Sequence, residues 1–344
     1  METAVAAMRG GRNQYAPGRG VRELREAVAA HQHRYYGLAV DPDTEVVVTA
    51  GATEAIAAAV FAFVNPGDEV VMLEPYYDSY PACVEMAGGV RRTVTLRAPD
   101  FRLDVDALRA TVNDRTALLL LNSPHNPTGT VLTREELEVV AEVAQRHDVV
   151  VVTDEVYEHL TFDGRAHVSL CTLPGMWDRT VTISSAGKTF SFTGWKVGWA
   201  TGPRALVDAV MGAKQWLTFC NAAPLQPAVA HALVHESHFH EALAASLQEK
   251  RDLLCEGLSS LDMQVHLPEG TYFAISDVSA YGHADAVAFC RALPERAGVV
   301  AIPASVFYDD LAEGRHRVRW AFCKERPVLE EAVTRLRKAD LYAG

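Results

Sequence analysis

Short apolar runs rich in β-branched residues recur through the first two-thirds of the chain and alternate with segments of helical periodicity. The runs are continuously apolar and lie at residues 45–49, 69–73, 117–121, 149–153 and 180–184. Continuous apolar runs are typical of strands that are covered on both faces, as in a parallel sheet. Because helical segments separate them, the pattern predicts βαβ units and a doubly wound α/β fold.

The segment between the third and fourth runs carries the clearest helical signal. Thr133 is a predicted N-cap, because Glu136 follows three residues later as in a capping box. Apolar residues then repeat on one helical face, at Leu137, Val140, Ala141 and Ala144. The sequence therefore predicts an amphipathic helix between these two strands.

The last third of the chain changes character and predicts a smaller α+β unit. Helical patterns lie at about 241–260 and 327–338. Shorter strand-like runs lie at 271–276, 298–302 and 317–322. Pro327 stands at a favourable first helical position of the last helix.

We place a domain boundary near 235–242, where no linker rich in Pro, Gly or Ser occurs. Residues 22–238 are expected to form a large domain, and residues 1–21 together with 239–344 a small one. Without a flexible linker, the two parts are expected to share an interface.

Composition and charge exclude several classes of protein. With 49% hydrophobic and 22% charged residues over 344 positions, the chain is ordinary globular material rather than a disordered one. The net charge of −12 gives no broad attraction to nucleic acid or anionic lipid. No apolar run is long enough to span a bilayer, the start lacks signal-peptide features, and the six cysteines are scattered. We therefore expect a cytoplasmic protein without nucleic-acid, membrane or metal partners.

A polar cluster follows each of the five apolar runs. The clusters are GATE at 51–54, EPYYD at 74–78, NSPHNPTG at 122–129, DEVY at 154–157 and SSAGKT at 184–189. Because the carboxyl ends of parallel strands meet at one edge, a lysine, an aspartate, a tyrosine, an asparagine and an aromatic ring should surround one pocket. That inventory suits pyridoxal 5'-phosphate (PLP), which needs an amine for a Schiff base, a carboxylate for its pyridine nitrogen and a phosphate cup.

Six segments together resemble the class I/II aminotransferases of PLP fold type I. They are NQYAPGRGVRELREAVA at 13–29, GATEA at 51–55, SPHNPTG at 123–129, DEVYEHL at 154–160, SSAGKTFSFTGWKVGW at 184–199 and VRWAFCK at 318–324. Each motif alone is weak, but six in the family's order and spacing are specific. The resemblance implies a mostly parallel central sheet with helices on both faces and a smaller α+β C-terminal domain.

The resemblance also implies catalytic and cofactor-binding roles. Lys188 would form the Schiff base and move the substrate proton, and Asp154 would pair with the pyridinium nitrogen. Tyr157 and Asn126 would hydrogen-bond the phenolate oxygen, with Asn126 also bordering the substrate. Tyr77 would stack on the ring.

The phosphate would be held by several groups at once. The resemblance assigns the backbone N–H groups of Ala52 and Thr53 at a helix N-terminus. It adds the Ser185 hydroxyl and the Lys196 ammonium group. Tyr15 resembles the tyrosine that reaches the phosphate in the other subunit of a homodimer.

On the substrate side, Arg319 resembles the arginine that grips the α-carboxylate with a bidentate fork. Tyr272, Phe307 and Trp216 would border the donor side chain. In the family, a Gly-rich stretch over the substrate precedes the point where this chain begins. We therefore expect that the start lies upstream or that this cover is absent, which makes the N-terminal part truncated relative to the family.

The predicted reaction is ping-pong transfer of an amino group from an L-amino acid to a 2-oxo acid such as 2-oxoglutarate. The strings GATEAIAAAV, EPYYDSY and SPHNPTGTVL are most similar to the N-succinyldiaminopimelate aminotransferase subgroup and are also similar to the methionine/aromatic and kynurenine aminotransferases.

Three other functions share part of this pattern. A PLP-dependent lyase that cleaves a Cβ–sulfur bond on the same fold stays open, as does a catalytically idle PLP-fold protein. A P-loop nucleotide hydrolase is disfavoured, because Thr182 stands where the first glycine of that motif is required before Gly187 and Lys188.

Overall fold

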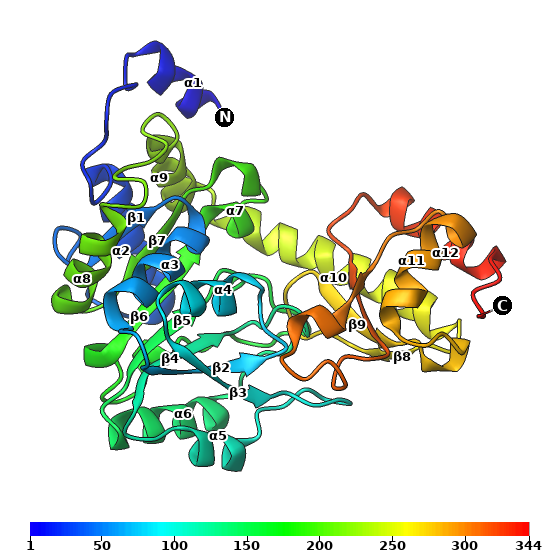
Figure 1. Ribbon diagram of the computed structural model, residues 1–344. Helices are drawn as coiled ribbons and strands as arrows, with labels where there is room; N and C mark the ends of the chain where they lie inside the picture. The colour runs from blue at the N-terminus through cyan, green and yellow to red at the C-terminus, as the bar shows by residue number, and fades with distance from the viewer. Residues whose placement is uncertain (344) are drawn as a thin grey trace.

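Two β-sheets organise the computed structural model, which describes residues 1–343 (Figure 1). The larger sheet has the order β1-β7-β6-β5-β4-β2-β3. Its strands are β1 (Val46–Thr49), β2 (Glu69–Glu74), β3 (Val90–Thr95), β4 (Thr116–Asn122), β5 (Val150–Asp154), β6 (Thr180–Ser185) and β7 (Gly198–Thr201). The five strands from β3 to β6 are parallel, and β7 runs antiparallel to both β6 and β1. The prediction of a mostly parallel α/β sheet is confirmed.

Helices cover both faces of this sheet (Figure 1). They are α2 (Arg22–Tyr36), α3 (Gly51–Phe63), α4 (Ser79–Met86), α5 (Val105–Thr111), α6 (Arg134–Arg146), α7 (Ala186–Thr189), α8 (Arg204–Lys214) and α9 (Gln226–His235). Val71 and Leu119 pack on the side of α5 and α6, whereas their neighbours Val70 and Leu118 pack on the side of α3 and α8. Successive strand residues thus enter opposite cores, which explains why the runs are continuously apolar.

The predicted capping box is confirmed at the start of α6. The Thr133 hydroxyl accepts a hydrogen bond from the Glu136 N–H at 3.2 Å. The Glu136 carboxylate in turn accepts one from the Thr133 N–H at 2.7 Å. Two donors that no helical carbonyl can reach are therefore satisfied.

The C-terminal part is built on an antiparallel sheet of order β10-β11-β9-β8. Its strands are β8 (Gln264–His266), β9 (Phe273–Asp277), β10 (Ile302–Pro303) and β11 (Arg317–Ala321), and its helices are α10 (Ser237–Ser259), α11 (Ala286–Ala297) and α12 (Arg326–Lys338). The predicted run at 298–302 shrinks to the two residues of β10, because most of it is the turn after α11, where Gly298 adopts a left-handed conformation. The side chains of Val156, Tyr157 and Leu160 from the large-sheet part join the core of this C-terminal part.

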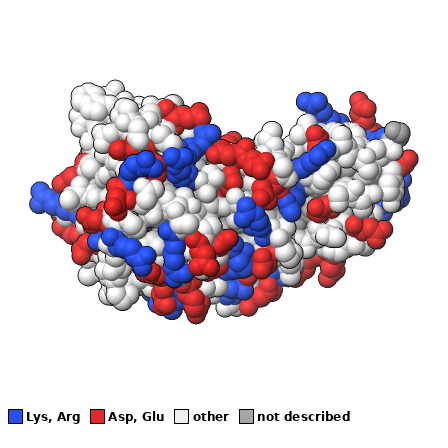
Figure 2. All heavy atoms as spheres, turned by 60° about the horizontal axis from the view of Figure 1, so that its bottom comes forward, with Lys and Arg blue, Asp and Glu red and all other residues white. Residues whose placement is uncertain are grey.

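Five 3-10 helices complete the described secondary structure, at Leu170–Thr172, Trp177–Arg179, Thr193–Trp195, Ser279–Tyr281 and Ala304–Phe307. The first helix, α1 (Glu2–Arg9), lies beside α9 and borders a groove with α2 and α9 (Figure 1). None of the described helices is both long and apolar enough to cross a membrane. On the face shown in Figure 2, basic side chains are interspersed with acidic ones, so this face offers no extended basic surface to a polyanion.

Candidate active site

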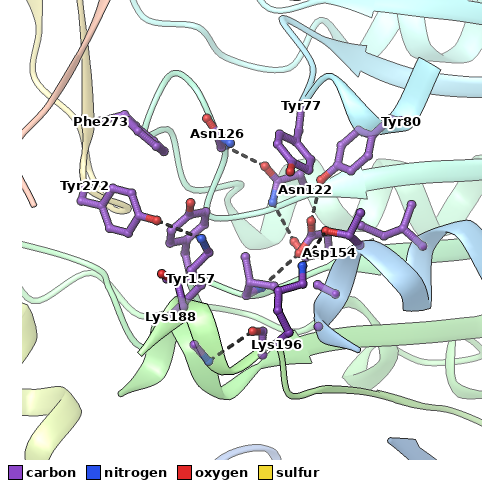
Figure 3. A pocket seen from close by; sticks show the side chains of 18 of the residues that line it. Tyr77, Tyr80, Asn122, Asn126, Asp154, Tyr157, Lys188, Lys196, Tyr272 and Phe273 are labelled. Carbon is purple, nitrogen blue, oxygen red and sulfur yellow. Dashed lines mark hydrogen bonds between the residues drawn. The ribbon is translucent and has the colours of Figure 1, made fainter. Parts of the chain in front are cut away.

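A cavity of about 270 Å³ opens where the ends of β4, β5 and β6 meet the start of α3 and the edge of the C-terminal sheet (Figure 3). Eleven of the predicted site residues line it: Ala52, Thr53, Tyr77, Asn126, Asp154, Tyr157, Ser185, Lys188, Lys196, Tyr272 and Arg319. Residues that sequence reasoning did not single out also line it, among them Tyr80, Asn122 and Phe273. The polar clusters at the strand ends therefore converge as expected.

Asp154 is the buried carboxylate of the cavity, at the last position of β5. Its Oδ2 accepts a hydrogen bond from the Tyr80 hydroxyl at 2.7 Å, and its Oδ1 accepts one from the Val156 N–H at 3.3 Å. The Asn122 side chain donates to the Asp154 backbone carbonyl at 2.8 Å. Burial raises the pKa of Asp154 to about 6, although the Tyr80 hydroxyl and the Val156 N–H stabilise the ionised form.

Lys188 extends from the short helix α7 directly after β6. Its Nζ donates a hydrogen bond to the Tyr272 hydroxyl at 2.9 Å (Figure 3). A glycine is needed at position 187, because a Cβ there would lie 2.9 Å from the Thr193 Cα. The Ser185 hydroxyl caps α7 by accepting the Gly187 N–H at 3.2 Å.

A cradle for an anion lies at the start of α3. Lys196 reaches toward it from a left-handed turn, with its Nζ 3.5 Å from the Thr53 hydroxyl. The first N–H groups of a helix have no partner within the helix and carry its positive dipole end, so Ala52 and Thr53 can donate to a phosphate. Gly198 allows β7 to approach closely, because a Cβ there would lie 2.7 Å from the Gly51 carbonyl carbon.

Arg319 projects from β11 between two aromatic rings. Its guanidinium carbon lies 4.3 Å from the Phe273 ring centroid and 4.7 Å from that of Phe307. One guanidinium N–H donates to the Asn126 side-chain oxygen at 3.1 Å. Within residues 1–343, no carboxylate lies within ion-pair distance of Arg319, so the guanidinium can bind the carboxylate of a ligand.

Tyr77 and Asn126 also line the cavity (Figure 3). The Tyr77 ring meets the Tyr80 ring edge to face, with centroids 5.7 Å apart. The Asn126 backbone N–H donates to the Asn122 side-chain oxygen at 2.7 Å, which orders the loop that carries Asn126.

Tyr15 and Trp216 lie outside this cavity. Each is 83% exposed, and the Tyr15 ring contacts the Phe219 ring with centroids 5.6 Å apart. Phe307 lies under the guanidinium of Arg319 and does not line the cavity. Only Tyr272 of the three residues expected around the donor side chain therefore borders the cavity of the described chain.

The residues missed by sequence reasoning had local signals. Tyr80 lies in the first turn of α4, three positions after Tyr77, and its backbone N–H bonds the Tyr77 carbonyl at 2.9 Å. Asn122 is the last residue of a buried strand, directly before the loop that carries Asn126. Polar residues at the ends of buried strands are candidates for the same reason as Asp154.

Comparisons with known proteins agree with this arrangement. The sequence model of the family described as "Aminotransferase class I and II" matches residues 1–336. A probable N-succinyldiaminopimelate aminotransferase of Mycobacterium tuberculosis is 50% identical over 98% of this chain and 87% of that protein. The methionine aminotransferase of Escherichia coli is 40% identical over 95% of this chain and 85% of its own length. The structure of N-succinyldiaminopimelate aminotransferase from M. tuberculosis superposes with a TM-score of 0.95 at 51% identity, covering 97% of this chain and 88% of that one.

Proposed function

Because this chain belongs to the class I and II aminotransferases, we propose that its cavity binds pyridoxal 5'-phosphate and uses it for transamination. The family makes the protein a transaminase, an enzyme that moves an amino group from an amino acid to a 2-oxo acid. One observation carries the cofactor proposal: the Lys188 amine, the buried Asp154 carboxylate and the start of α3 all face a single cavity.

The donor set of the cavity fits both charges of this cofactor. Asp154 is buried without an ion-pair partner in the part of the chain that the structure describes, so a protonated ring nitrogen would supply the missing cation. At the start of α3, the helix dipole and the Lys196 ammonium group favour a phosphate, and the Ser185 hydroxyl adds a donor. Among the residues that line the cavity, Asp154 is the only one with a carboxylate.

The side chains of the cavity then have distinct tasks. When bound, PLP supplies an aldehyde for attachment to amines and a ring that draws electrons from the substrate Cα. The buried Asp154 carboxylate would hold the ring nitrogen by accepting its N–H hydrogen bond, which would favour the protonated ring. Tyr157 and Asn126 line the cavity as possible donors to the phenolic oxygen, and Tyr77 would offer a ring for it to stack on. The Lys188 amine would hold the proton that leaves the substrate Cα, as the general base of the site.

Arg319 binds the α-carboxylate that amino acids and 2-oxo acids share. Both substrates therefore use one site in turn, which gives ping-pong kinetics. We propose N-succinyl-LL-diaminopimelate as the first donor to test, with 2-oxoglutarate as acceptor, since the relative at 50% identity carries that name. The aromatic rings of Tyr272 and Phe273 at the cavity support methionine and aromatic amino acids as the second candidate donors.

Two measurements test this function. Reduction of the holoenzyme with borohydride, followed by peptide mapping, should place a pyridoxyl group on Lys188, and a label elsewhere or no label contradicts the assignment. A panel of amino donors with 2-oxoglutarate should then identify the donor by kcat/KM. Release of pyruvate and ammonia from a cysteine conjugate without an acceptor would instead indicate a Cβ–sulfur lyase.

We also propose a homodimer in which Tyr15 reaches the phosphate of the other subunit. Support comes from Tyr15, which is exposed and lies outside the cavity of its own chain. A mixed dimer of Tyr15→Phe and Lys188→Ala chains tests this, because one of its two sites should keep both residues only if the site is shared. The six free cysteines fit the proposed cytoplasmic location.

We propose residues 22–238 as the large domain and 239–344 as the small one. Residues 1–21, which were expected to join the small domain, instead go with the large one, because α1 packs against α9 and Lys214 bonds the Gly18 carbonyl.

A further inference from the structure

The Lys188 amine is held by a residue from the opposite sheet. Lys188 follows β6 of the large sheet, whereas Tyr272 directly precedes β9 of the C-terminal sheet. The hydrogen bond from Lys188 Nζ to the Tyr272 hydroxyl at 2.9 Å therefore crosses the cavity between the two parts of the chain (Figure 3).

The backbone before Tyr272 is attached to the large-sheet part at several points. The Gly270 N–H donates to the Gly129 carbonyl and the Thr271 N–H to the Leu160 carbonyl, both at 2.9 Å. A Cβ on Gly270 would lie 2.7 Å from the Leu160 carbonyl oxygen, so the close approach requires glycine. Tyr272 is thus placed by the same two loops that carry Asn126 and Tyr157, and its hydroxyl position is defined relative to the site.

Two tyrosine rings lie beside the Lys188 amine. The rings of Tyr157 and Tyr272 meet edge to face with centroids 5.2 Å apart, and Lys188 Nζ lies 5.7 Å and 5.6 Å from these two centroids. Burial and the adjacent Tyr272 hydroxyl raise the pKa of Tyr157 well above its ordinary value. The Tyr157 hydroxyl therefore keeps its proton at neutral pH, and no phenolate competes for the amine there.

We propose that Tyr272 is a positioning residue for the Lys188 amine and receives this amine whenever it is not covalently engaged. The proposal rests on the proposed function and assigns Tyr272 a task beyond bordering the donor side chain. An amine that donates one N–H to a fixed oxygen has a defined direction for its lone pair, which is the group that takes the substrate Cα proton. Tyr272 itself neither gains nor loses a proton in this step.

The contact can be tested first in the cofactor-free protein. Competitive acetylation with acetic anhydride, read by mass spectrometry, compares Lys188 with the five other lysines of the chain. In Tyr272→Phe, labelling of Lys188 relative to the others should rise about fivefold, the factor that one hydrogen bond of ordinary net strength supplies. The matched control is Tyr281→Phe, which removes a hydroxyl from another tyrosine of the C-terminal part. Equal labelling of Lys188 in the two variants overturns the proposal.

A second measurement separates positioning from substrate binding in the loaded enzyme. With a donor deuterated at Cα, Tyr272→Phe should slow the first half-reaction about tenfold, the scale of losing one oriented hydrogen bond, and should raise the isotope effect. The donor KM should stay within about twofold, since phenylalanine keeps the ring that borders the donor side chain and only the hydroxyl is removed. A raised KM with an unchanged rate overturns the proposal and leaves Tyr272 as a wall of the pocket. A wild-type enzyme without transaminase turnover would refute the proposed function instead, while the acetylation result would still decide the contact.

Discussion

The Tyr80 hydroxyl donates a 2.7 Å hydrogen bond to Oδ2 of the buried Asp154 carboxylate. Tyr80 lies in α4 and Asp154 at the end of β5, so the bond joins a covering helix to the sheet edge where the cavity opens. Burial opposes ionisation of Asp154, whereas this hydroxyl favours it. The pair therefore controls how readily the cavity holds a negative charge opposite a protonated ring.

Replacing Tyr80 by Phe should weaken PLP binding and move its pH dependence. With a pKa of about 6, Asp154 loses its charge as the pH falls through that value, and cofactor affinity should fall with it. Without the hydroxyl the pKa rises further, so the loss should begin at higher pH and the affinity at pH 7 should drop about fivefold. Fluorescence titration with PLP from pH 5 to 8 measures this.

The matched control is Tyr76→Phe, which removes a hydroxyl that bonds Asp309 at 2.8 Å outside the cavity. If both variants showed the wild-type pH dependence, the Tyr80 hydroxyl would have no part in cofactor binding.

Asp154→Asn should make the cofactor-free protein more stable at neutral pH. Burial raises the pKa of the folded Asp154 from 3.8 to about 6, so between these values the folded state binds more protons than the unfolded state. Stability therefore falls as the pH rises through this window, by roughly 2–3 kcal/mol in full. Asn carries no charge, so the variant should be more stable than the wild type at pH 7.5 and equal to it near pH 4, by thermal unfolding.

The same variant should lose transaminase turnover by about 100-fold or more, because a neutral amide cannot hold the ring proton. If the Asp154→Asn variant is less stable than the wild type at pH 7.5, burial of the ionised Asp154 carboxylate does not destabilise the folded protein.

Much of this site could be predicted because its residues follow buried strands, where a motif and a strand end coincide. Asp154, Asn126 and Lys188 are of this kind, and all line the cavity. Tyr80 and Phe273 were missed because nearness to a predicted site residue does not by itself distinguish a cavity residue from a core aromatic; only the packing of α4 and β9 does so.

Two strands of the large sheet could not be predicted from the sequence, because tertiary contacts rather than local patterns form them. Strand β3 was missed because its edge position leaves Arg91 and Arg92 on a partly exposed strand that lacks a continuous apolar run. Strand β7 was missed because its four residues start at Gly198, whose place in a sheet depends on the close approach to α3. Neither feature has a periodic signal in the sequence.

Gly198→Ala should disturb the phosphate cradle. The new Cβ would lie 2.8 Å from the Ala52 backbone nitrogen, so the start of α3 must move away from β7. Because that start supplies N–H donors, the affinity for PLP should fall by about tenfold or more, measured by the same titration. Gly212→Ala is the control, since a Cβ there meets nothing within 4 Å and the residue lies inside α8. The Gly212→Ala variant should keep its affinity for PLP and gain up to about 1 kcal/mol of stability. An equal loss of affinity in both variants would show that the start of α3 does not bind the phosphate.

Arg319→Lys tests how the substrate carboxylate is recognised. A lysine keeps the positive charge but cannot present two parallel N–H groups, and it loses the planar contact with the rings of Phe273 and Phe307. Because the α-carboxylate is common to the amino donor and the oxo acceptor, kcat/KM should fall about 100-fold for both half-reactions, while PLP affinity stays unchanged. Arg317→Lys is the matched control, two positions earlier on the same strand face, where the guanidinium lies 6.0 Å from the Phe101 ring centroid and away from the cavity. A loss confined to one substrate would mean that Arg319 reads the side chain of that substrate rather than the carboxylate that both share.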